Sequence, residues 1–183
     1  MIKNVLKIPF VKYGLLTGGL IFLVKAAIYA SGNIGYRFNP VYTFGTALAI
    51  VIGVVLAFRE LDEIKTKKTY SSYLFHGLLV VLISMTFSSS CDQIFYAINP
   101  QIPAEIKNLT IMEFDELDEK LSKDILVDQR KILADSDPKD MVGIAPFFAY
   151  ITNTSLLNAV LVLIASLFFW LKSRKKDQLS IDN

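Results

Sequence analysis

The stretch that decides the fold is residues 73–98, which read YLFHGLLVVLISMTFSSSCDQIFYAI. It is longer than the roughly 20 mostly apolar residues with which an α-helix crosses a bilayer, and Asp92 is its one charged residue. Three more apolar stretches lie at Phe10–Ser31, Val41–Phe58 and Ile144–Leu171. The sequence therefore predicts an all-α integral membrane protein with four transmembrane helices.

The composition agrees with this class of protein. The mean hydropathy of +0.46 and the 53% of hydrophobic residues are both high for a soluble globular domain. Outside the four stretches lie one polar block, Asn99–Asp140, two short loops and two tails, which leave no room for a soluble catalytic domain of usual size. We interpret residues 1–183 as a single transmembrane domain with a helical insertion at 99–140.

The basic residues predict the orientation. Lysines and arginines gather at the start of the first stretch, between the second and third, and after the fourth, whereas residues 32–40 hold only Arg37. Short basic loops stay in the cytoplasm, so both termini are predicted to be cytoplasmic and 99–140 extracytoplasmic. Lys25 interrupts the first stretch and no small-residue cleavage site follows it, so we expect a retained helix rather than a secretory signal.

Small residues recur along the predicted helices at intervals of three, four or seven positions. Helices in a bilayer associate through close backbone approach and buried polar contacts, which small residues allow. The residues predicted to lie at helix–helix contacts are Gly14, Gly18, Gly45, Ala49, Gly53, Gly77, Ser84 and Ser88. Two interpretations stay open: these faces pack the helices of one chain, or one of them drives self-association or binds a partner's helix.

Two charges inside the predicted helices are the best site candidates. Lys25 and Asp92 both lie about 9 Å from the outer ends of their helices, at 1.5 Å per residue. A charge in the hydrocarbon is costly unless it is paired, hydrated or snorkelling. We expect an ion pair between them, near Ser88. The pair would fix helix register or form a polar pocket for an ion or small ligand; alternatively, Lys25 snorkels alone.

No catalytic or metal-binding motif is recognised. Metal sites need three or four convergent ligands, and the only histidine, His76, has no companion. Ser88 to Ser90 with Lys25 resemble a serine–lysine dyad, but no strained turn or oxyanion motif accompanies them. We therefore predict that the chain is not an enzyme, and that it uses no cofactor, no metal and no nucleic acid.

The block at 99–140 is predicted to be structured. Pro100 and Pro103 are expected to end the third helix, and Thr110 with Glu113 has the pattern of a capping box. We predict one amphipathic helix over Ile111–Leu133, with acidic first turns that suit the helix dipole. Its apolar face would cover the outer mouth of the bundle or bind a partner, and includes Phe114, Leu117, Leu121 and Ile125. Asp137 and Pro138 are typical of a further helix start.

The opening Lys12–Gly19, with sequence KYGLLTGG, resembles that of a bacterial family of four-helix inner-membrane proteins catalogued as a domain of unknown function. Tyr73–Gly77 is similar to that family's entry into its third helix, and the charged block at 99–140 matches its layout. The resemblance covers nearly the whole chain and rests on diffuse glycines and aromatic residues. It implies a Gram-negative inner membrane and transfers no catalytic residue.

Two function classes remain from the sequence. The first is a non-enzymatic accessory or assembly subunit of a bacterial envelope complex, in contact with membrane lipid and with other envelope proteins or copies of itself. The second is a small oligomeric transporter or channel that uses Lys25 and Asp92. No convincing repeat relates the two halves of the chain, which weighs against the second class.

Overall fold

The computed structural model describes residues 8–30, 40–64, 69–118, 124–137 and 143–179. All elements in these ranges are α-helices. They are α2 (Pro9–Ala30), α3 (Pro40–Glu63), α4 (Tyr70–Ile98), α5 (Gln101–Asp118), α6 (Asp124–Asp135) and α7 (Ile144–Leu179).

Within the described residues, four helices are long and apolar enough to span a membrane: α2, α3, α4 and α7. The prediction of four such helices is confirmed. Two of them extend beyond the apolar stretches, because α3 continues to Glu63 and α7 to Leu179. Thr69 begins α4 as its N-cap, with its hydroxyl accepting a hydrogen bond from the backbone N–H of Ser72 at 3.2 Å.

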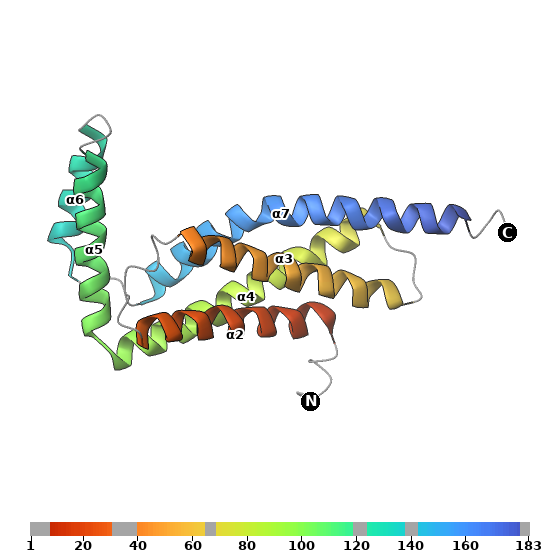
Figure 1. Cartoon of the computed structure of the whole chain (residues 1–183), viewed down its shortest axis with the longest axis horizontal. Coiled ribbons are helices and arrows are strands. Elements are labelled where there is room, and N and C mark those ends of the chain that lie inside the picture. Colours follow the sequence, from red (N-terminus) through yellow and green to blue (C-terminus); the bar gives the residue numbers. More distant parts are fainter. Residues whose placement is uncertain (1–7, 31–39, 65–68, 119–123, 138–142, 180–183) are drawn as a thin grey trace.

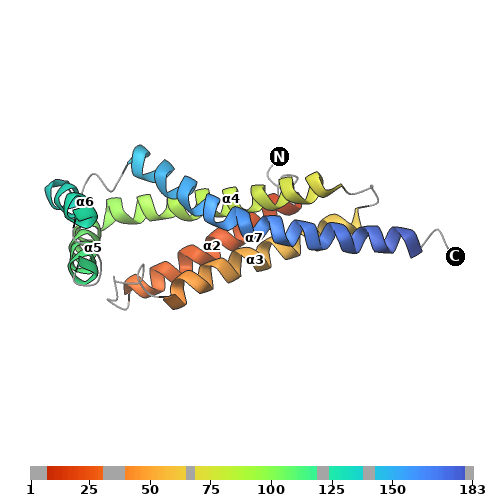
Figure 2. The ribbon, with the colours of Figure 1, turned by 90° about the horizontal axis from the view of Figure 1, so that it is seen from above.

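The four long helices run along the long axis of the molecule, while α5 and α6 lie across one end (Figures 1 and 2). We call α5 and α6 together the hairpin. α4 is the central helix and packs against α2, α3 and α7. The end of α2 and the start of α3 lie at the hairpin end, where Ile28 and Tyr42 pack against a buried cluster of Tyr96 from α4 with Ile102 and Ile106 from α5.

Aromatic side chains fill the core at the opposite end of the bundle. The ring of Phe58 on α3 meets Tyr73 of α4 and Phe169 of α7 edge-on, with centroids 5.3 Å apart in both cases. Gly77 makes room for this cluster, since a Cβ there would lie 2.6 Å from Val162 and 2.9 Å from Phe58. These contacts join α3, α4 and α7 into one core.

The prediction of a single helix over Ile111–Leu133 is wrong. The structure has two helices there, α5 and α6, and α5 begins ten residues earlier than predicted, at Gln101. Pro103 lies in the first turn of α5, where a missing backbone N–H costs nothing. Thr110 is inside α5 and donates to the carbonyl of Ile106 at 2.8 Å, so the predicted capping box does not form. The acidic residues expected in a first turn occupy the last turns of α5.

Because the structure has two helices here and not one, the predicted partner-binding residues lie on different helices. Phe114 and Leu117 lie in α5 and Ile125 in α6, whereas Leu121 falls outside the described residues. Phe114 and Leu117 are therefore on a different helix from Ile125. The helix start predicted at Asp137 and Pro138 also falls partly outside the described residues, and α7 begins at Ile144.

Gly143 precedes α7 with a φ of 142°, a conformation that L side chains rarely adopt. Its N–H donates to Oε1 of Gln93 on α4 at 2.8 Å, and its carbonyl accepts from Phe147 at 3.2 Å. Glycine at this position therefore lets the chain turn into α7 while staying attached to α4.

Candidate functional site

The structure brings together the two intramembrane charges that the sequence analysis singled out. Nζ of Lys25 on α2 donates to Oδ2 of Asp92 on α4, and also to Oγ of Ser88 at 3.1 Å. Both charged side chains are enclosed by the bundle, with 2% of the Lys25 side chain and 7% of the Asp92 side chain exposed. The site is a closed, charge-assisted hydrogen-bond cluster between two spanning helices.

Glycines on α2 create the close approach that the pair requires. A Cβ on Gly18 would lie 2.6 Å from the carbonyl oxygen of Ser84, and one on Gly14 would lie 2.8 Å from Cβ of Ile83. Real Cβ atoms do not come this close, so only glycine fits at these two positions. Gly14 and Gly18, which the sequence predicted to lie at a helix–helix contact, therefore pack α2 against α4.

The face of α4 that meets α2 carries a polar stripe at intervals of four residues, formed by Ser84, Ser88 and Asp92. Ser84 Oγ lies 3.0 Å from the carbonyl of Gly14 on α2 and 2.7 Å from that of Val80 on its own helix, and can donate to either. Ser88 and Asp92 follow one and two turns later and contact Lys25. The stripe thus runs from a backbone contact near the bundle centre to the ion pair near the hairpin end.

The electrostatics of the cluster favour a stable pair. Two charges removed from water are held only when their geometry and hydrogen bonds are good, and removing one partner leaves a costly isolated charge. Lys25 is a donor to Ser88, and an ammonium group has no lone pair with which to take the serine proton. As long as Lys25 carries its charge, it holds the Ser88 hydroxyl by a hydrogen bond and does not take its proton.

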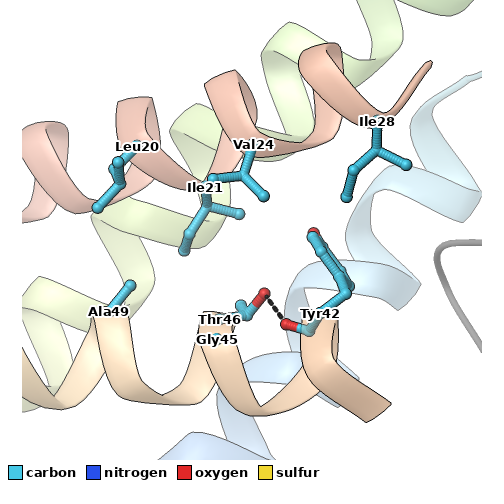
Figure 3. Close-up of a pocket in the computed structure, with 8 residues that line it drawn as sticks. All are labelled: Leu20, Ile21, Val24, Ile28, Tyr42, Gly45, Thr46 and Ala49. Carbon is cyan, nitrogen blue, oxygen red and sulfur yellow. Dashed lines mark hydrogen bonds between the residues drawn. The ribbon is translucent and has the colours of Figure 1, made fainter. Parts of the chain in front are cut away.

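The other predicted packing residues fall into two groups. Gly53 of α3 packs on Thr17 of α2, since a Cβ there would lie 2.2 Å from its Oγ1, and Gly77 packs in the aromatic core described above. A Cβ on Gly45 would meet nothing within 4 Å, so Gly45 does not bring two described helices of this chain together. Gly45 and Ala49 instead line an apolar cavity between α2 and α3 (Figure 3).

Sequence reasoning missed a second ion pair at the far end of α2. Nζ of Lys12 lies 2.8 Å from Oε2 of Glu60 on α3, with 40% and 29% of these side chains exposed. In the sequence, Lys12 is one of the basic residues that predict the topology and the first residue of the KYGLLTGG segment, and neither role indicates an acidic partner. The sequence did contain a signal for its partner. Consecutive spanning helices are antiparallel, so an acid near the end of the second, such as Glu60, can meet a base near the start of the first, such as Lys12.

A hydrogen-bonded clamp that the sequence did not indicate holds the hairpin together. Nζ of Lys107 on α5 donates to the carbonyl of Ala134 at 2.8 Å and to that of Ser136. These carbonyls lie at the end of α6, where backbone acceptors lack helical partners. The clamp fixes the two helices of the hairpin against each other.

The remaining candidates have local partners. Nδ1 of His76 lies 2.7 Å from the carbonyl of Ser72, and its ring meets Phe10 edge-on at 5.3 Å. Ser90 donates to the carbonyl of Thr86, one turn earlier on its own helix. In the part of the chain that the structure describes, no three His, Cys, Asp or Glu residues converge to hold a metal ion.

Comparisons with known proteins give no relative from which a function could be transferred. No family model, no curated protein and no solved structure matches this chain. The resemblance to a four-helix inner-membrane family stays a prediction. The function has to be argued from the site and the shape of the molecule.

Proposed function

We propose that this protein is a non-enzymatic accessory or assembly subunit of a bacterial envelope complex, held in the inner membrane by α2, α3, α4 and α7. The observation that carries the proposal is the hairpin. It lies across one end of the bundle and packs against the spanning helices at its base, through a small cluster that includes Tyr96 of α4 (Figure 1). A projecting pair of helices is suited to contact a partner.

The hairpin has a defined shape before any partner binds. Ile102 and Ile106 at its base are buried against Tyr96, and the Lys107 clamp holds the end of α6 on α5. Beyond the base, Met112 and Ile132 expose 62% and 72% of their surface. A rigid element with exposed apolar side chains loses little conformational entropy on docking, which favours binding.

The orientation belongs to the same proposal. With both termini in the cytoplasm, as the basic residues predict, the hairpin projects on the extracytoplasmic side. Its partner is then the extracytoplasmic part of another envelope protein. The basic end of α7, with Lys172 and Arg174, lies on the cytoplasmic side in this arrangement.

Photocrosslinking in living cells tests the proposal. A photoreactive phenylalanine analogue at Met112 or Ile132 should form an adduct with one partner protein, whereas the same analogue at Ile164, exposed on α7, should not. Met112→Asp with Ile132→Asp should abolish copurification of that partner in mild detergent while leaving the thermal unfolding of the chain unchanged. Adducts equal at all three positions, or copurification unaffected by the two aspartates, would overturn the proposal.

A small oligomeric transporter or channel is the second candidate, and the observation in its favour is a buried Lys25, Asp92 and Ser88 cluster at membrane depth. The closed state of the cluster weighs against it, because the cavity between α2 and α3 is lined by other residues. The two candidates are separable. A homo-oligomer that passes ions across liposomes, and loses this flux with Asp92→Asn, supports the transporter.

A further inference from the structure

α2 and α3 diverge toward the hairpin end and leave a cavity of about 340 Å³ between them. Figure 3 shows its two walls facing each other across the gap. The eight lining residues are Leu20, Ile21, Val24 and Ile28 from α2, and Tyr42, Gly45, Thr46 and Ala49 from α3. The divergence starts beyond Gly53, where the two helices are in contact through Thr17.

The cavity extends along the two helices. The lining positions on each helix recur at intervals of one, three or four residues, and those on α2 span eight residues, or about 12 Å of helix. The ring of Tyr42 reaches from α3 toward Ile28 and bounds one end (Figure 3). Ile28 and Tyr42 themselves pack against the cluster at the base of the hairpin, so the cavity lies next to that base.

The outer sides of α2 and α3 next to the cavity are apolar, and in a bilayer they would face the hydrocarbon. Leu20 and Val24 on the rim of the cavity are 53% and 44% exposed, and both helices are apolar enough to span a membrane. Water is a poor occupant, since a buried water needs two to four polar partners. Among the lining residues only Tyr42 and Thr46 have polar side-chain atoms, and the Thr46 hydroxyl already donates to the carbonyl of Tyr42 at 2.9 Å.

We propose that this cavity is a binding site for one acyl chain of a membrane phospholipid. An unfilled apolar space leaves its walls without dispersion contacts, and a slender hydrocarbon chain lying along the two helices restores them. A helix of a second copy, about 10 Å across, would have to enter a wedge that closes where Gly53 of α3 meets Thr17 of α2.

Photoreactive lipid labelling tests this site. The wild-type chain is placed in vesicles of phosphatidylethanolamine and phosphatidylglycerol that contain a little phosphatidylethanolamine with a diazirine in one acyl chain. After irradiation, peptide mass spectrometry should locate adducts mainly on residues 20–28 and 42–49. Gly45→Leu fills the cavity without a clash at its Cβ, and should reduce these adducts about tenfold, the effect of losing burial for about two methylene groups.

The matched control is Leu48→Phe, which adds bulk to α3 at a 60% exposed position outside the cavity and should leave the adducts unchanged. A second measurement needs no variant: native mass spectrometry of the detergent-extracted chain should show one retained phospholipid. Adducts spread evenly over the exposed residues of all four spanning helices would overturn the proposal. So would disulfide-linked dimers formed efficiently by Gly45→Cys, because a second copy would then occupy the site.

Discussion

Two lysines on α2 are ion-paired with acids of neighbouring helices, but the two pairs lie in different surroundings. Lys12 meets Glu60 of α3 with 40% and 29% of the side chains exposed, whereas Lys25 meets Asp92 of α4 with 2% and 7% exposed. Exposed pairs contribute little because water and salt screen them. Buried pairs cannot lose one member without leaving an isolated charge. The same chemistry therefore fixes the register of α2 on α4 and only assists its contact with α3.

The largest effect is expected for Asp92→Ala, which tests whether the buried pair contributes more to stability than the exposed pair. It leaves Lys25 buried without its carboxylate, and we expect the free energy of unfolding to fall by about 3–5 kcal/mol. Reversible unfolding in mixed micelles measures the change. The double variant Lys25→Met with Asp92→Leu removes both charges and should recover most of the loss. If the double variant is as unstable as the single one, the charge explanation fails and packing is responsible.

The next effect comes from the glycine that brings α2 and α4 together. Gly18→Ala places a Cβ 2.6 Å from the Ser84 carbonyl, and overpacking of this kind costs about 1–3 kcal/mol. Gly45→Ala is the matched control. Its Cβ meets nothing, so the better helix propensity of alanine should stabilise the chain by up to about 1 kcal/mol. Equal effects of the two substitutions in the same unfolding assay would contradict the close approach seen at Gly18.

A smaller effect is expected from Ser88→Ala, which removes one of the hydrogen bonds that Lys25 donates. Interhelical hydrogen bonds in membranes contribute about 0.6 kcal/mol on average and up to about 1.7, and we expect a loss in that range. Ser90→Ala removes only a bond within its own helix and should be nearly neutral. The prediction is wrong if Ser90→Ala is the more damaging of the two.

The smallest effect is predicted at the exposed pair. Glu60→Gln should shift the melting temperature less than Ser88→Ala does, and raising the ionic strength should remove the remaining difference from wild type. The same rise in ionic strength should leave the effect of Asp92→Ala unchanged, because salt does not reach a buried pair. A salt-resistant effect of Glu60→Gln would show that the two pairs are alike.

The sequence was sufficient for the spanning helices and for the partner of Lys25. Long apolar stretches specify the helices through length alone, and the equal depth of Lys25 and Asp92 brings them to one level. The hairpin was not predictable in the same way. No glycine or proline lies between Ala104 and Asp137, so no local signal separates α5 from α6, and Thr110 with Glu113 has a capping pattern inside a continuing helix.

The small residues at regular intervals predicted some helix–helix contacts and not others. Gly18 and Gly45 have the same local signature, yet a neighbouring helix touches one and not the other. A glycine permits close approach, but whether a helix comes close depends on the angle at which the helices cross. That angle depends on side chains elsewhere in the bundle, which the local sequence around each glycine does not contain.

The corner between α4 and α5 has a mechanical consequence. Only Asn99 and Pro100 separate the two helices. Two hydrogen bonds hold the corner: the side-chain amide of Asn99 donates to the carbonyl of Phe95 at 3.0 Å, and the backbone N–H of Ile102 donates to the carbonyl of Asn99 at 3.1 Å. The 18 residues of α5 make an arm about 27 Å long, so a tilt of about 10° at the corner moves its tip about 5 Å. Asp92 lies less than two turns before this corner. A small tilt of the end of α4 would therefore be magnified along α5, and the Lys25 and Asp92 pair, about 10 Å from the corner, holds α4 against such a tilt.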